Sequence, residues 1–107
     1  MSNVERIINN QLFGWDDEKA ALNWKKHRIK FENAAQVFAD ENRIERFDLT
    51  HSDAEDRYIT IGRVREILFV VYTERINADN INVTRLISAR RATKQERRDY
   101  YDGVQMD

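Results

Sequence analysis

The chain has 107 residues, of which 35% are charged and 41% hydrophobic, and its formal net charge at pH 7 is −1. The hydrophobic content excludes an intrinsically disordered chain, and the length suits one domain with a modest core. The absence of cysteine excludes disulfides and thiolate zinc sites. The longest apolar run, Ile67 to Tyr72, is too short to span a bilayer, and the amino terminus lacks an apolar signal region. We therefore expect a cytoplasmic protein with no membrane partner.

The first part of the chain predicts two helices after a polar extension. Residues 1–12 are expected to form a loose or helical extension, ahead of a single domain over residues 13–107. Asp16 can cap a helix that runs to about His27, because acidic residues follow the cap and basic residues stand near the end. Phe31 to Phe38 carries apolar residues at helical spacing, which predicts a second, short helix.

Four strands and a last helix are predicted for the rest of the chain. The strand patterns cover Arg43–Leu49, Arg57–Arg63, Ile67–Thr73 and Ile81–Ala89. The short polar connections between them favour antiparallel pairing. Thr93-Lys94-Gln95-Glu96 is a capping box, which begins a helix that runs to about Asp102. The predicted fold is α+β, with two N-terminal helices, a four-stranded mostly antiparallel sheet and a C-terminal helix.

Positive charge is concentrated in two segments of this nearly neutral chain. Residues 19–30 contain five basic residues and no acid, and residues 81–98 contain six basic residues and one acid. Phosphate is the leading candidate ligand, because a planar guanidinium matches two of its oxygens at once. The alternative interpretation is a solvated surface of mixed charges, which charge runs usually form.

A polar stripe lies on the first predicted helix. Asn23, Lys26 and His27 lie four, seven and eight residues after Lys19, so the four residues share one helix face. Such a stripe can meet a phosphodiester. The alternative is an ordinary solvated face, with the histidine interacting with carbonyl groups at the end of the helix.

Further candidates lie on the predicted strands and the loop before them. Glu55 either caps a local turn or acts as a general base or as the orienter of one. Tyr72 and Tyr100 either contact a nucleobase or belong to the core. The sequence contains no glycine-rich phosphate loop and no histidine–carboxylate motif typical of a metal site, so we expect no cofactor and no metal.

Several short motifs occur in a specific order between about Phe13 and Tyr101. They include Trp15-Asp16, Lys19-Ala20, Asn23, Lys26-His27, Phe31-Glu32, His51-Ser52-x-x-Glu55-x-Arg57, Ile61-Gly62, Val70-Val71-Tyr72, Glu74-Arg75 and Ile87-Ser88-Ala89-Arg90-Arg91-Ala92. Because it carries these motifs in this order, the chain resembles the BrnT family of bacterial type II toxins. One position departs from the family pattern, because Arg28 stands where a glycine commonly ends the helix. The helix therefore either ends in a strained left-handed turn or ends differently.

The resemblance implies a RelE-like fold and metal-independent cleavage of RNA, which would inhibit translation and growth. It also implies a BrnA-like antitoxin with a ribbon-helix-helix part, with two toxins on an antitoxin dimer. Operator DNA would then be bound only through the antitoxin. The expected catalytic residues are His27, Glu55, Arg57, Arg75 and Arg90. The expected RNA-binding residues are Lys19, Asn23, Lys26, Arg91 and Lys94.

Cleavage without metal requires deprotonation of the 2′-hydroxyl, stabilisation of the phosphorane charge and protonation of the 5′-oxygen. The hypothesis is that His27 or Glu55 transfers a proton. The three arginines at positions 57, 75 and 90 would hold the scissile phosphate, and Lys26 the flanking backbone. Two alternatives remain, a catalytically inactive antitoxin-binding or co-repressor module and an RNA-binding domain without a toxin role.

Overall fold

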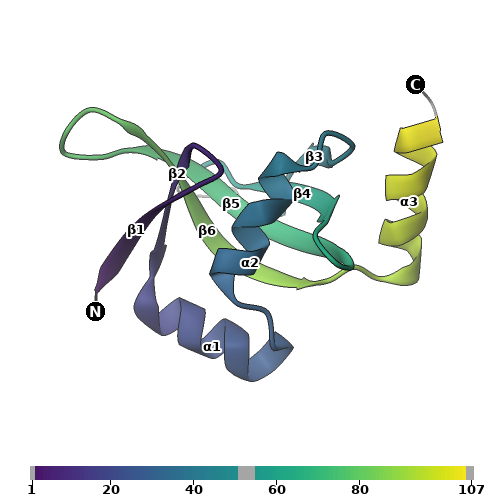
Figure 1. Cartoon of the computed structure of the whole chain (residues 1–107), viewed down its shortest axis with the longest axis horizontal. Helices are drawn as coiled ribbons and strands as arrows, with labels where there is room; N and C mark the ends of the chain where they lie inside the picture. The colour runs from purple at the N-terminus through teal and green to yellow at the C-terminus, as the bar shows by residue number, and fades with distance from the viewer. Residues whose placement is uncertain (1, 51–54, 106–107) are drawn as a thin grey trace.

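The computed structural model describes residues 2–50 and 55–105, which form one six-stranded mixed sheet with helices on it (Figure 1). The order of strands across the sheet is β1-β2-β6-β5-β4-β3. The elements are β1 (Asn3–Ile8), β2 (Gln11–Asp16), α1 (Asp17–His27), α2 (Phe31–Ala35), the 3₁₀ helix η1 (Gln36–Ala39), β3 (Ile44–Phe47), β4 (Tyr58–Arg63), β5 (Ile67–Ile76), β6 (Asn82–Arg91) and α3 (Lys94–Gln105).

The predicted four-stranded sheet behind a polar extension is wrong, although the α+β class is right. Residues 3–16 form the β1–β2 hairpin, and β2 adds to β6 in parallel through Phe13 and Gly14. Asn9 and Asn10 connect the two strands with φ angles of 52° and 66°. Consecutive positive φ angles define the tight turn whose twist suits a hairpin, and asparagine tolerates them well. β1 was missed because an edge strand with exposed side chains lacks a hydrophobic signal.

The predicted bounds of α1 and the predicted start of α3 are confirmed, whereas Phe31–Phe38 forms the short helix α2 followed by η1, and α3 runs beyond Asp102 to Gln105. The Oδ1 atom of Asp16 accepts hydrogen bonds from the backbone N–H groups of Glu18 (2.8 Å) and Lys19 (3.4 Å), which caps α1. At the start of α3, the N–H of Thr93 donates to Glu96 Oε1 (2.8 Å) and the N–H of Glu96 donates to Thr93 Oγ1 (3.2 Å). This reciprocal pair is the predicted capping box.

The two faces of the sheet are covered differently. On one face, α1, α2 and η1 pack on a core that includes Phe13, Phe31, Val70 and Leu86, each at most 1% exposed. On the other face, α3 packs over the β4 side of the sheet through Tyr100 and its neighbours. Figure 1 shows α2 crossing in front of the sheet and α3 at the end farthest from the β1–β2 hairpin. The second face is therefore helix-covered at one end, and the rest of it carries the candidate site.

The longest helix, α3, has 12 residues. In the described ranges it and the other helices fall short of the length and apolar character that a membrane span requires.

Candidate nucleic-acid interface

Arginines from two neighbouring strands, β5 and β6, gather on one side of the sheet. The register places Arg90 opposite Phe69, Arg85 opposite Thr73, and Arg75 opposite Val83. Because side chains alternate along β5, positions 69, 73 and 75 point away from the core beneath α2. We call the side of the sheet that carries Arg75, Arg85, Ser88 and Arg90 the arginine face.

A β-bulge in β6 creates this arrangement. Val71 lies opposite Ser88 whereas Tyr72 lies opposite Leu86, so Ile87 is an extra residue in β6. Arg85 and Arg90 are five residues apart and would point to opposite sides of a regular strand. The extra residue shifts the alternation by one and brings both guanidinium groups to the same face.

A carboxylate surrounded by guanidinium groups lies at the β5–β6 hairpin end of the arginine face. Arg75 donates from Nη2 to Glu55 Oε1 (2.9 Å) and from Nε to Glu55 Oε2 (3.2 Å). These bonds hold the pKa of Glu55 below its ordinary value, and the charges of Arg57 and Arg85 act in the same direction against a small desolvation. The structure thus brings together the predicted residues Glu55, Arg57 and Arg75, and it adds Arg85, which was not among the predicted site residues.

The predicted polar stripe of α1 lines a groove at the edge of the arginine face. Lys19, Lys26 and His27 border a hollow of about 240 Å³ together with Ile87 and Ser88 of the bulge. Lys19 and His27 are eight residues apart, which is roughly 12 Å along a helix axis. The groove therefore offers two ammonium groups, an imidazole and a hydroxyl to a ligand of nucleotide dimensions. Ser88 was missed because its position depends on the bulge.

Asn23 has a different role from the other members of that stripe. Its side chain is 5% exposed, and Nδ2 donates to the carbonyls of Ile29 (3.0 Å) and Ala89 (2.9 Å). Its Oδ1 accepts from the N–H of Ala89 (2.9 Å). The amide therefore takes the place of a neighbouring strand at the edge of β6 and fixes α1 against the sheet. All three hydrogen bonds are made with buried backbone groups of the protein itself.

The end of α1 is fixed by two arginines. Arg28 adopts φ 57° and ψ 32°, and its N–H donates to the carbonyl of Trp24. Of the two predicted alternatives, the left-handed turn is the one that forms. Arg91 Nη1 donates to the carbonyl of His27 (2.9 Å), and Arg91 Nε pairs with Glu66 (2.5 Å). Arg91 thus holds the segment that presents His27 to the groove.

Arg90 and Lys94 lie where β6 meets α3. Arg90 is paired with Glu96 through two hydrogen bonds (2.8 and 3.0 Å), and its guanidinium stacks 3.8 Å from the centre of the Phe69 ring. The hydrogen bonds from Arg90 lower the pKa of Glu96, against partial burial that raises it. Lys94 is exposed at the first turn of α3.

The register also limits what the arginines can do together. Phe69, opposite Arg90, and Arg75 are six residues apart on β5, which is about 20 Å at roughly 3.3 Å per residue. Each guanidinium is also held by a different carboxylate, Arg75 by Glu55 and Arg90 by Glu96. The role of both arginines at the scissile phosphate stays a prediction.

The remaining candidates are placed as follows. Tyr72 and Tyr100 are 5% and 4% exposed, and their hydroxyl groups donate to Glu45 (2.5 Å) and Asp40 (2.7 Å), so both belong to the core. His51 and Ser52 lie outside the described residues. Within residues 2–50 and 55–105, no three histidine, aspartate or glutamate side chains converge as a metal site would require.

The arginine face and the lysine–histidine groove concentrate positive charge on part of a small α+β protein, a pattern typical of proteins that bind polyanions. The sequence matches the family profile described as "Ribonuclease toxin, BrnT, of type II toxin-antitoxin system" over residues 15–96. The chain therefore belongs to the BrnT family, which confirms the resemblance found in the sequence. Membership makes it a ribonuclease toxin by class and implies a cognate antitoxin. No curated protein matches the chain.

Proposed function

We propose that this chain is an endoribonuclease toxin that cleaves RNA without a metal ion and thereby inhibits translation. The RNA strand lies along the arginine face, and the scissile bond lies at the α1 groove. The observation that carries this proposal is the convergence of Lys19, Lys26 and His27 with Ser88 on one groove beside the arginine face.

In this proposal His27 transfers the proton, because an imidazole both accepts and donates protons near neutral pH. Lys19 and Lys26 stabilise the charge of the phosphorane, since positioned cations are usually the largest contribution to such catalysis. Glu55 is a poor general base because Arg75 lowers its pKa. Its role is to position Arg75, which uses two donors on the carboxylate and keeps others for a phosphate.

The arginines then anchor the strand on either side of the groove. Arg57, Arg75 and Arg85 hold a phosphate at the hairpin end of the arginine face, and Arg90 holds another beyond the groove. Arg91 and Lys94 contribute attraction for the strand but are farther from the bond that breaks.

Kinetics of folded variants test this assignment. We expect His27→Ala to lower kcat for a defined RNA by about 10²-fold or more, which is the contribution of a positioned proton-transfer group. We expect Arg75→Ala and Arg90→Ala to raise KM more than they lower kcat. Lys25→Ala is the matched control, because Lys25 is exposed on α1 outside the groove and should cleave at the wild-type rate. Wild-type cleavage by folded His27→Ala protein would refute the proton-transfer role.

The partner in this proposal is a BrnA-like antitoxin that covers the groove and the arginine face. Two toxins would bind an antitoxin dimer, and operator DNA would be bound through the antitoxin alone. A toxin that carries its positive charge on one face presents a single surface on which an acidic segment can block substrate access.

One observation favours a second candidate, a catalytically inactive antitoxin-binding module. Arg75, Arg90 and Arg91 each form an ion pair within the chain, with Glu55, Glu96 and Glu66. An arginine held in this way can order a protein interface without binding phosphate. Turnover separates the two candidates, because an inactive module binds the antitoxin but produces no RNA fragments at any protein concentration.

A further inference from the structure

A second hollow, of about 390 Å³, lies at the C-terminal end of α1. Lys26 and His27 line the groove, and the next two residues, Arg28 and Ile29, line this pocket. The side chain of Arg91 borders the pocket and donates to the carbonyl of His27. The groove and the pocket are therefore lined by consecutive residues of the chain and are linked by the hydrogen bond from Arg91 to His27.

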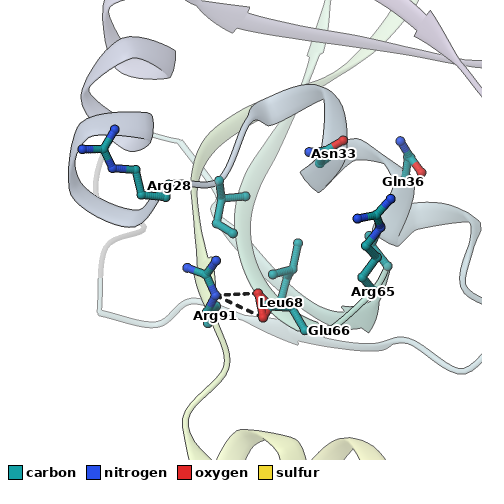
Figure 2. Close-up of a pocket in the computed structure, with 9 residues that line it drawn as sticks. Arg28, Asn33, Gln36, Arg65, Glu66, Leu68 and Arg91 are labelled. Carbon is teal, nitrogen blue, oxygen red and sulfur yellow. Dashed lines mark hydrogen bonds and ion pairs between the residues drawn. The ribbon is translucent and has the colours of Figure 1, made fainter.

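Two amide side chains stand on one wall of the pocket. Asn33 and Gln36 come from consecutive turns of α2 and η1, and Figure 2 shows them on the side opposite Arg28 and Arg91. Both residues are exposed, and no residue of the described part of the chain forms a hydrogen bond with either side-chain amide. Each amide therefore offers an unused donor and an unused acceptor.

The other residues that line the pocket are either apolar or charged. Ile29 and Leu68, at 7% and 3% exposure, form part of an apolar floor. Three arginines and one glutamate line the pocket, which gives it a net charge of +2. Glu66 is paired with Arg91, as Figure 2 shows, so Arg28 and Arg65 carry the unbalanced charge.

We propose that this pocket binds one purine nucleotide of the RNA, next to the scissile bond. The proposal rests on the proposed function, and it adds a determinant of substrate preference. An amide matches the N6–H and N7 of adenine, and a guanidinium matches O6 and N7 of guanine, so both kinds of side chain read purine edges. The apolar floor takes the face of the base, and Arg28 or Arg65 takes its phosphate.

An acidic peptide is the other ligand that a cationic pocket suggests, but it uses only part of this lining. A carboxylate presents acceptors alone, so an acidic side chain pairs with the guanidinium groups and the amide donors but not with the amide oxygens of Asn33 and Gln36, which only the peptide backbone or water would reach. A base edge presents a donor beside an acceptor and satisfies both atoms of an amide. A volume of about 390 Å³ is near the lower end of ordinary ligand pockets, roughly 300–1,000 Å³, which suits a single nucleotide.

Nuclear magnetic resonance of the labelled full chain tests the proposal directly through the side-chain amide signals of Asn33 and Gln36. The probes are AMP, GMP, CMP, UMP, inorganic phosphate and hexaglutamate. We expect the purine nucleotides to shift both signals and to bind about tenfold or more tightly than the pyrimidine nucleotides. The double variant Asn33→Ala/Gln36→Ala should lose that preference, and Asn42→Ala, which removes an exposed amide elsewhere, should keep it. Equal binding of purines and pyrimidines, shifts with phosphate alone, or shifts with hexaglutamate but no nucleotide would each overturn it.

Because this experiment measures binding without cleavage, its failure is distinguishable from failure of the proposed function. A chain that cleaves RNA but binds no purine nucleotide at these amides refutes only the pocket assignment. A chain that binds purine nucleotides here but cleaves no RNA refutes the ribonuclease proposal and supports the pocket. In an active chain, the double variant should raise KM for purine-containing RNA with kcat unchanged.

Discussion

Replacing Asn23 by alanine should destabilise the protein far more than an ordinary surface substitution. The variant removes three buried hydrogen bonds, to the carbonyls of Ile29 and Ala89 and from the N–H of Ala89. A buried backbone group left without a partner costs about 1–3 kcal/mol. With partial relaxation of the helix, the total loss should be about 3–5 kcal/mol, a large share of the roughly 5–15 kcal/mol that stabilises a typical domain.

Urea unfolding followed by circular dichroism and tryptophan fluorescence measures this loss. At about 4–8 °C per kcal/mol for a small domain, the melting temperature should fall by about 12 °C or more. Asn33→Ala, an exposed amide on α2, is the control and should change the unfolding free energy by less than about 0.5 kcal/mol. A loss below about 1 kcal/mol in Asn23→Ala, together with weakened RNA binding, would refute the structural role and favour the direct RNA contact expected from the sequence.

Two further predictions concern the end of α1 and the response to alkaline pH. Arg28→Gly should raise the unfolding free energy by about 0.5–1 kcal/mol in urea unfolding, because glycine adopts the left-handed turn without the strain of a Cβ atom, and Arg28→Ala should give no gain. Burial and the hydrogen bond to Asp40 raise the pKa of Tyr100 to about 12, so the residue stays neutral in the folded protein where the unfolded chain ionises. Stability should therefore fall between about pH 10 and pH 12, and Tyr100→Phe should reduce that slope; an unchanged slope would contradict the assignment.

Local signals in the sequence predicted the parts of the fold that depend on neighbouring residues. The Asp16 cap, the length of α1 and the capping box of α3 each follow from side chains that hydrogen-bond within one turn. The β1–β2 hairpin could have been found from Asn9-Asn10, because two adjacent asparagines tolerate the positive φ angles of a tight turn. The turn was not recognised because the strand before it, β1, is mostly exposed and lacks a pattern of buried apolar residues.

The site depends on contacts that no local pattern contains. The arginine face exists because Ile87 is an extra residue in β6. A single inserted residue cannot be recognised from the alternation of apolar and polar residues in so short a strand. Asn23 fell on the same helix face as Lys19 and His27, so spacing alone could not separate a buried hydrogen-bonding residue from a ligand-binding one. The partners of Arg75 and Arg90 likewise come from distant segments or from the following helix.

The chemical ends of RNA fragments produced in the presence of EDTA test the central claim most directly. Attack by the 2′-hydroxyl, with proton transfer at His27 and charge stabilisation by lysines, leaves a 2′,3′-cyclic phosphate on one fragment and a 5′-hydroxyl on the other. We expect these ends from the wild-type chain and from Lys25→Ala, and little product from His27→Ala. Fragments that carry a 3′-hydroxyl and a 5′-phosphate, or cleavage abolished by EDTA, would contradict metal-independent catalysis at this groove.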